Sequence, residues 1–126
     1  MKWATPGSVL AATMAISMVT IYFIWRVTEP LAASEPQTIE IKVSEFKFEP
    51  KEVRIRAGEV IFKISNEGLI EHNFVIEGEA AASIPVIAPG KSEELRVTMK
   101  SGEYQLVCSL PGHKEAGMVG TLKVEE

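Results

Sequence analysis

Apolar and polar residues alternate along much of the chain after residue 37. In residues 39–43 and 53–55 every second side chain is aliphatic and its neighbours are charged, and Phe46 and Phe48 continue the alternation as far as Pro50. Successive side chains of a strand point to opposite faces, so strict alternation is typical of strands with one buried face. The pattern therefore predicts short, half-buried strands in this part of the chain.

Glycine-containing turn signals divide the rest of this region. They lie at residues 57–59, 66–68, 89–91 and 101–103. The apolar runs beside them predict further strands at residues 60–65, 73–76, 94–98, 104–108 and 120–124. Residues 77–88 do not show a strand pattern. About seven to eight short strands with turns at this spacing predict an all-β fold, a β-sandwich.

The N-terminal segment has a different pattern. Residues 3–25 carry no charge, and Trp3, Tyr22 and Trp25 lie near the two ends of this stretch. About 20 apolar residues cross the hydrocarbon core of a bilayer as a helix, and Trp and Tyr are enriched at its two interfaces. Residues 1–26 are therefore predicted to form one N-terminal transmembrane helix that anchors the chain in membrane lipid.

A secretory signal peptide is the alternative for this segment, with cleavage near residues 31–33. Its apolar region would be longer than usual, and the charged Arg26 would follow it. The anchor is therefore the favoured interpretation. Residues 27–36 contain two prolines and no apolar periodicity, which predicts an extended tether. The folded domain is then expected over residues 37–126.

The chain contains one cysteine and two histidines. Cys108, His113 and Met118 follow one another with the spacing Cys-x4-His-x4-Met, and Pro111 and Gly112 form a turn signal between the first two. Taken alone, a cysteine or a methionine is more typical of a packed core than of a site. Together, thiolate, imidazole and thioether are the soft and borderline ligands that favour copper. With a single cysteine, an intrachain disulfide is excluded.

A blue-copper site takes two imidazoles and one thiolate, with a long, weak bond to an axial methionine. The second histidine is His72, at the start of an apolar run that is predicted to be a strand. His72, Cys108, His113 and Met118 would therefore form a complete ligand set for one copper ion that cycles between Cu(I) and Cu(II).

With these residues the chain resembles the cupredoxins, the small blue copper proteins. The Cys-x4-His-x4-Met spacing is most similar to that of the auracyanin and rusticyanin branch, because plastocyanins have a shorter Cys-to-His loop and azurins a shorter His-to-Met loop. The resemblance covers residues 37–126. It implies a cupredoxin-like, Greek-key β-sandwich with the copper site at one end.

The resemblance also implies roles for residues beside the ligands. Cupredoxins commonly carry an asparagine after the first histidine that hydrogen-bonds to the residue after the cysteine, and Asn73 and Ser109 occupy these positions. Such contacts hold ligands in place and tune the metal. The resemblance further favours His113, which has small and apolar neighbours, as the entry and exit route for electrons. It also implies that the domain is exported.

These features predict a membrane-anchored electron carrier of a photosynthetic or respiratory chain, with the copper domain on the periplasmic, extracytoplasmic side of the cell membrane. Redox proteins such as cytochromes or membrane electron-transfer complexes are the expected partners. A copper-binding module for copper delivery or oxidase assembly is the alternative. The ligand set leaves no open coordination position and supplies no general base, so no catalysis is expected.

The net charge says little about the partners of this protein. All 17 acidic residues follow residue 28, as does every Lys and Arg except Lys2 and Arg26, so this part carries a net charge of about −6 against −4 for the whole chain. Such a charge favours a basic partner, but alternating signs along the strands are equally typical of an ordinary solvated surface. There is no basic cluster, so nucleic-acid binding is not expected.

Overall fold

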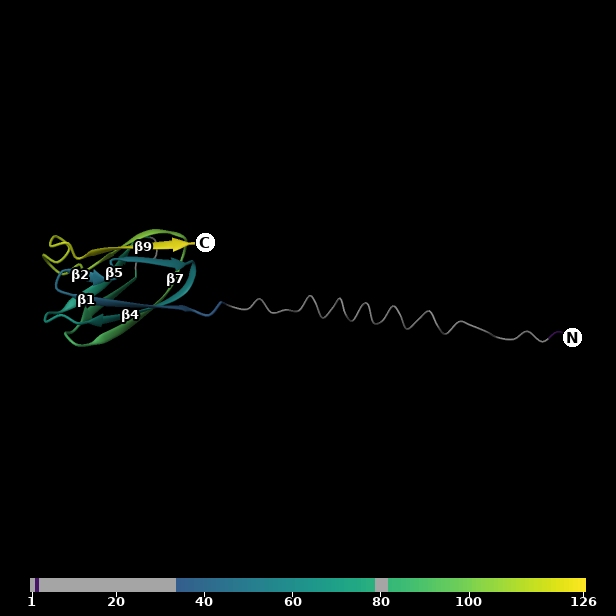
Figure 1. The fold of residues 1–126 in the computed structure, drawn as a ribbon, viewed down its shortest axis with the longest axis horizontal. Helices are drawn as coiled ribbons and strands as arrows, with labels where there is room; N and C mark the ends of the chain where they lie inside the picture. Colours follow the sequence, from purple (N-terminus) through teal and green to yellow (C-terminus); the bar gives the residue numbers. More distant parts are fainter. Residues whose placement is uncertain (1, 3–33, 79–81) are drawn as a thin grey trace. The chain divides into compact units, whose positions relative to one another are not determined.

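The computed structural model describes Lys2, residues 34–78 and residues 82–126. Nine strands are found in these residues (Figure 1): β1 (Gln37–Ser44), β2 (Lys47–Glu49), β3 (Glu52–Arg56), β4 (Gly58–Asn66), β5 (His72–Glu77), β6 (Ala82–Ile87), β7 (Ser92–Met99), β8 (Gly102–Val107) and β9 (Val119–Glu125). They form a sandwich of two sheets, with the strand orders β2-β1-β4-β7 and β3-β9-β8-β5-β6. The predicted all-β sandwich is confirmed, with more strands than the seven to eight expected.

The chain passes repeatedly from one sheet to the other. β1 pairs in parallel with β4, and β3 pairs in parallel with β9, whereas the other paired strands are antiparallel. Parallel strands cannot be joined by a tight hairpin, so each parallel pair needs a longer crossover connection. In the first pair, this connection includes β3, which lies in the opposite sheet.

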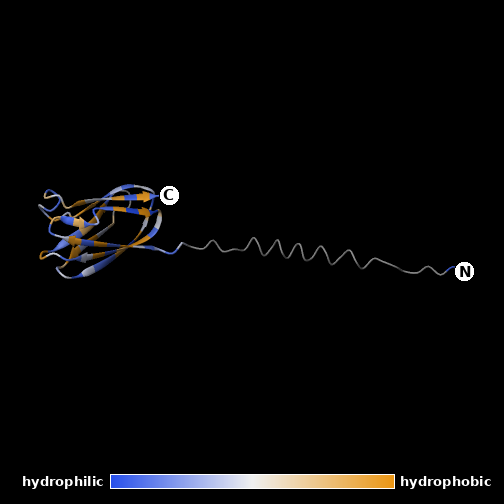
Figure 2. Cartoon of the chain, in the orientation of Figure 1, coloured by the Kyte–Doolittle hydropathy of each residue, from blue (hydrophilic) through white to orange (hydrophobic). Residues whose placement is uncertain are grey.

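The alternation of apolar and polar residues determines the core. Ile41 and Val43 of β1 and Phe62 and Ile64 of β4 are fully buried, while the charged residues between them are exposed. Figure 2 shows the resulting stripes of hydrophobic and hydrophilic residues along the strands. Each such buried side chain stabilises the fold by about 1.5–3 kcal/mol relative to an exposed position. The predicted half-buried strands therefore supply the packing between the sheets.

The interpretation of residues 77–88 as lacking a strand was wrong, because β6 (Ala82–Ile87) lies within them at the edge of the five-stranded sheet. The register between β5 and β6 shifts at a β-bulge. As a result, Ile84 and Ile87 are both buried although they are three residues apart. A bulge breaks the two-residue period, and an edge strand tolerates the missing N–H of Pro85.

Phe46 also departs from the predicted alternation. Phe48 is buried in β2, but Phe46 lies in the turn before it, with φ 60° and 44% of its surface exposed. Strand residues have strongly negative φ values. The ring of Phe46 therefore leaves the strand pattern and stays outside the core.

The predicted transmembrane helix, residues 1–26, lies outside the described residues apart from Lys2. The described part of the chain contains no helix that is long and apolar enough to span a membrane. Ser34–Glu126 form one compact unit. The sandwich can therefore be considered by itself.

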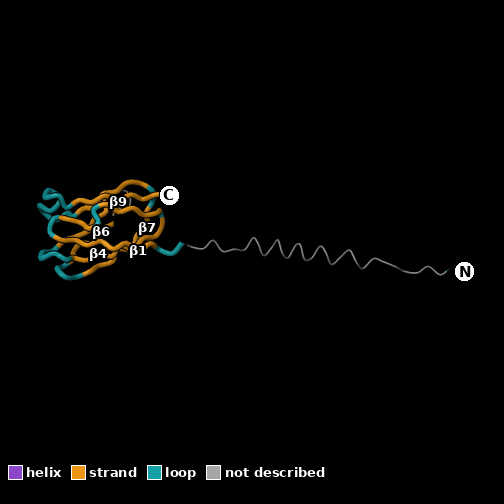
Figure 3. The backbone as a smooth tube through the Cα atoms, viewed as in Figure 1, coloured by secondary structure: helices purple, strands orange, loops and turns teal. Residues whose placement is uncertain are grey.

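The two ends of the sandwich carry different structures. Ser34 and Gln37 line a surface depression together with Glu126, so the described domain begins and ends on the same side. Figure 3 shows longer loops gathered at the opposite end. These loops include residues 67–71 and 108–118, which flank or contain the candidate ligands.

Candidate metal centre

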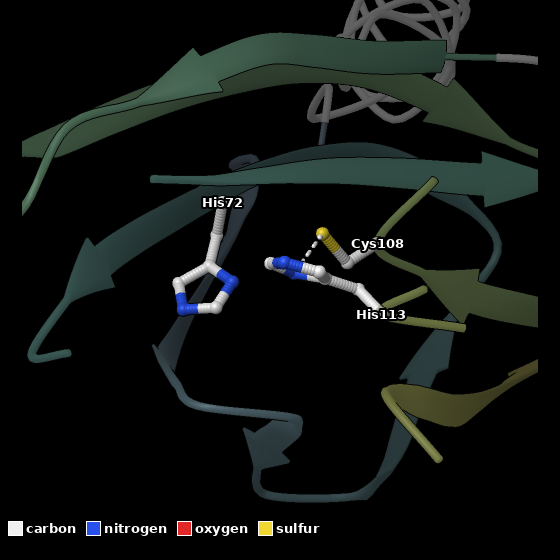
Figure 4. Close-up of side chains that lie close together, drawn as sticks. All are labelled: His72, Cys108 and His113. Carbon is white, nitrogen blue, oxygen red and sulfur yellow. Dashed lines mark hydrogen bonds between the residues drawn. The ribbon is translucent and has the colours of Figure 1, made fainter. Parts of the chain in front are cut away.

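Two neighbouring strands bring the candidate ligands together. β5 begins at His72, β8 ends one residue before Cys108, and the two strands pair in antiparallel fashion. In an antiparallel pair the start of one strand lies beside the end of the other. The ligating atoms of His72, Cys108 and His113 all lie within 4.8 Å of one another (Figure 4).

The segment from Cys108 to Met118 is a compact loop. The backbone N–H of Met118 donates to the carbonyl of His113 at 3.0 Å, and the N–H of Cys108 donates to the carbonyl of Met118 at 3.3 Å. Gly112 and Gly117 have φ values of 84° and 98°, which residues with a Cβ rarely adopt. Met118 is therefore tied through its backbone to both of the other ligands in this loop.

Most of the ligand group is closed to solvent. His72, Cys108 and Met118 are 0% exposed, whereas His113 is partly exposed. The Sγ atom of Cys108 lies 3.4 Å from Nδ1 of His113 and accepts a hydrogen bond from the backbone N–H of Asn73 at 3.5 Å. The two imidazole rings meet edge to face, with centroids 5.1 Å apart. His113 is thus the member of the group that reaches the surface.

The surroundings of His72 match those of a metal ligand. Neither ring nitrogen has a hydrogen-bond partner among the described residues, although the imidazole is fully buried. Leaving a buried polar group unpaired costs about 1–3 kcal/mol. Burial, with a smaller effect of neighbouring His113, lowers the pKa of His72 and favours the neutral imidazole that metals bind. Beside a thiol, a second imidazole and a thioether, this residue completes a donor set that fits one type 1 copper ion.

Asn73 and Ser109 connect the two ligand segments. The Nδ2 group of Asn73 donates to Oγ of Ser109, and the N–H of Ser109 donates to Oδ1 of Asn73, both at 2.8 Å. These bonds join the residue after His72 to the residue after Cys108. The contact that the resemblance implied is present, and its effect on the metal stays a prediction.

The sequence interpretation recognised Asn66 only as part of a turn signal. Its side chain is 2% exposed and donates from Nδ2 to the carbonyls of Ile70 and Ile87, at 2.8 Å each. Its Oδ1 accepts the backbone N–H of Gly68 at 2.9 Å. Asn66 therefore fixes the loop that leads into His72.

Glu45 and Phe46 contact the ligand loops, and the sequence interpretation gave neither residue a role at the site. The Glu45 carboxylate accepts the backbone N–H of Leu69, and this bond holds the pKa of Glu45 below its ordinary value. The Phe46 ring meets the His113 ring edge to face, with centroids 5.4 Å apart. Both contacts cross between loops, so the alternation along one strand gives no signal for them.

A β-sandwich with two imidazoles, one thiol and one thioether at one end defines the class of small blue copper proteins. The family model of the cupredoxin-like domain matches residues 15–122 of the chain. The chain therefore belongs to the cupredoxin-like domain family.

The chain is similar to a copper-resistant cuproprotein, to a plastocyanin and to a solved auracyanin structure. The copper-resistant cuproprotein CopI of Rubrivivax gelatinosus is 30% identical over 114 residues, covering 74% of this chain and 69% of that protein. The chloroplast plastocyanin of Chlamydomonas reinhardtii is 28% identical over 131 residues, covering 94% and 88% respectively. The solved structure of dithionite-reduced auracyanin from Roseiflexus castenholzii has a TM-score of 0.65 at 23% identity, covering 71% of this chain and 98% of that one. This last likeness shows the fold.

Proposed function

We propose that this protein carries single electrons, with His72, Cys108, His113 and Met118 holding one copper ion. The observation that carries the proposal is the preassembled group of His72, Cys108 and His113, whose ligating atoms lie within 4.8 Å of one another. Met118 is fully buried and is bonded through its backbone to both loop ligands. A bound copper ion supplies a one-electron Cu(I)/Cu(II) couple, and a rigid donor set limits the rearrangement between the two states. The likeness to plastocyanin supports the same function.

The residues around the ligands have roles that follow from their contacts. Asn73 and Ser109 hold the two ligand segments at a fixed separation. The N–H of Asn73 donates to the sulfur of Cys108, and hydrogen bonding around this sulfur tunes the potential. Burial of His72 and Met118 keeps water away from the donor atoms.

His113 is the proposed route for the electron, because it is the partly exposed member of the group. Near it, Phe46 is 44% exposed, and the loop that Glu45 contacts carries Leu69 at 88% and Ile70 at 41% exposure. Exposed apolar surface of this kind suits contact with another protein. The proposed partners are redox proteins such as cytochromes or membrane electron-transfer complexes.

Copper handling is the second candidate function. It is favoured by the likeness to a protein described as a copper-resistant cuproprotein, which shares 30% identity with this chain. In this case the same donor group would store or deliver copper without cycling it between oxidation states.

Mixing experiments with a basic c-type cytochrome separate the two candidates. The oxidised, copper-loaded protein is expected to be blue and to lose its colour as it oxidises the reduced cytochrome, one electron per protein. An association rate constant of about 10⁵–10⁷ M⁻¹s⁻¹ is expected, and it should fall with added salt because the domain is acidic. A colourless protein that holds only Cu(I) and passes copper to a chelator would contradict electron transfer and favour copper handling.

We further propose that residues 1–26 anchor the protein in the cell membrane, that residues 27–36 are a tether, and that the domain of residues 37–126 lies on the periplasmic side. The support is the uncharged stretch of residues 3–25. The mass of the native protein tests the anchor. Retention of the N-terminal segment is expected, whereas loss of about the first 33 residues would show a cleaved signal peptide.

A further inference from the structure

One short turn contacts the loops of both histidines. The turn between β1 and β2 contains Glu45 and Phe46, and we refer to these two residues as the Glu45–Phe46 turn. Glu45 accepts the backbone N–H of Leu69, three residues before His72. Phe46 places its ring against the ring of His113. The turn therefore connects two ligand segments that are far apart in the sequence.

The backbone of Phe46 is unusual for its residue type. Its φ of 60° is the only positive value at a non-glycine residue in the part of the chain that the structure describes. Positive φ is unfavourable for a residue with a bulky side chain and persists where surrounding contacts determine it. The ring is 44% exposed, so core packing does not explain this conformation. A two-residue turn joins the paired residues Ser44 and Lys47, and a positive φ at the second turn position is usual there, where glycine is the common residue. Phe46 occupies this position instead, and its ring contacts His113.

The Glu45 carboxylate can reach the N–H of Leu69 because residue 68 is a glycine. A Cβ atom at Gly68 would lie 2.5 Å from a Glu45 carboxylate oxygen, closer than real Cβ atoms approach. Gly68 is itself held by Asn66, which accepts its backbone N–H. The loop before His72 is therefore shaped so that an exposed carboxylate from another strand connection can bind it.

We propose that Glu45 and Phe46 are positioning residues for the copper ligands. Glu45 holds the loop that leads into His72, and Phe46 fixes the ring orientation of His113. The inference rests on the ligand set proposed above and adds to it two residues that touch no metal. Residues that orient ligands typically change metal affinity by about 10–100-fold when they are replaced.

The first test uses the metal-free, full-length protein and does not depend on copper. Nuclear Overhauser contacts between the rings of Phe46 and His113 are expected in the wild type. In Phe46→Leu the ring resonances of His113 should shift and its ring should sample more than one orientation. Unchanged His113 resonances in this variant would overturn the role of Phe46.

The second test separates positioning from stability. In Phe46→Gly the ring is lost but the positive φ is no longer strained. The melting temperature of the metal-free variant should stay near or above that of the wild type, while copper affinity falls about tenfold and the visible band pattern of the Cu(II) form changes. A variant that loses stability and keeps the wild-type affinity and spectrum would show a purely structural residue and contradict the proposal.

The third test addresses Glu45. Glu45→Ala should weaken copper binding about tenfold, measured by competition with a chelator, whereas Glu45→Gln keeps a side-chain acceptor for Leu69 and should restore most of the affinity. Gly68→Ala should resemble Glu45→Ala, because the added methyl group displaces the carboxylate. Glu71→Gln is the matched control. It removes the same charge beside His72, and the Glu71 carboxylate accepts no hydrogen bond from the described residues.

The outcomes distinguish this inference from the proposed function. A blue wild type with unaffected Glu45→Ala and Gly68→Ala variants would overturn the role of Glu45 and leave the copper site intact. Equal losses in Glu45→Ala and Glu71→Gln would show an effect of charge alone and would also overturn it. A wild type that binds no copper would refute the ligand set, and the resonances of His113 would still decide whether Phe46 positions its ring.

Discussion

Cys108→Ser is expected to abolish the blue colour of the copper-loaded protein completely. The colour of a blue-copper site arises from charge transfer between the thiolate and Cu(II), and a serine hydroxyl is a harder, weaker donor at the same position. The fold should survive, because Cys108 is a small buried residue whose backbone N–H bonds to Met118 independently of its side chain. Visible absorption and circular dichroism of the same sample measure the two effects together. A blue Cys108→Ser variant would exclude Cys108 as the thiolate ligand.

Met118→Leu is the matched contrast within the same loop. Leucine fills a similar buried volume but offers no sulfur, so the variant should still bind copper and stay blue. Loss of a weak axial donor disfavours Cu(II), so the reduction potential should rise. A tenfold relative weakening of Cu(II) binding corresponds to about 59 mV for one electron. If both the potential and the spectrum were unchanged, Met118 would not be the axial ligand.

Much of the candidate site could be predicted because its chemistry depends on rare residue types. One cysteine and two histidines leave few combinations, and Cys108, His113 and Met118 lie close together in the sequence. His72 could be placed because the apolar run after it marks a strand, and β5 does begin at this residue. Most strands were predictable for a similar reason, since burial of one face imposes a period of two.

The features that could not be predicted depend on contacts that follow no regular spacing along the sequence. In β6, a bulge turns both Ile84 and Ile87 into the core, which removes the alternation that would have indicated a strand. Glu45 and Phe46 act across the end of the sandwich on loops that only the fold brings near them. Local sequence patterns report the local backbone, so such contacts between distant loops give no signal.

The site is expected to oppose the stability of the metal-free domain. His72 is surrounded by protein, yet neither of its ring nitrogens has a partner in the described region. Proteins often accept unfavourable local interactions where function requires them. His72 should therefore destabilise the metal-free protein and become favourable only when a metal ion is bound.

His72→Leu is expected to stabilise the metal-free protein while it abolishes tight copper binding. Leucine removes the unpaired imidazole nitrogens, whose burial costs about 1–3 kcal/mol, and supplies apolar surface at a fully buried position. The gain should appear as a higher urea midpoint at an unchanged m value. Asn73→Leu, at the next residue, is the control. It removes hydrogen bonds that are satisfied and should therefore lower the midpoint.

The decisive comparison is the pH dependence of the free energy of unfolding, measured for the wild type and for His72→Leu. Because burial lowers the pKa of His72 from its ordinary value of 6.5, the unfolded wild-type chain binds more protons than the folded one below that pH. The free energy of unfolding of the metal-free wild type should therefore have its full value above pH 6.5. It should decrease as the pH is lowered below 6.5. His72→Leu should lose this dependence. A variant that is less stable than the wild type and keeps the same slope would show that His72 is a satisfied core residue and not a ligand held ready for a metal.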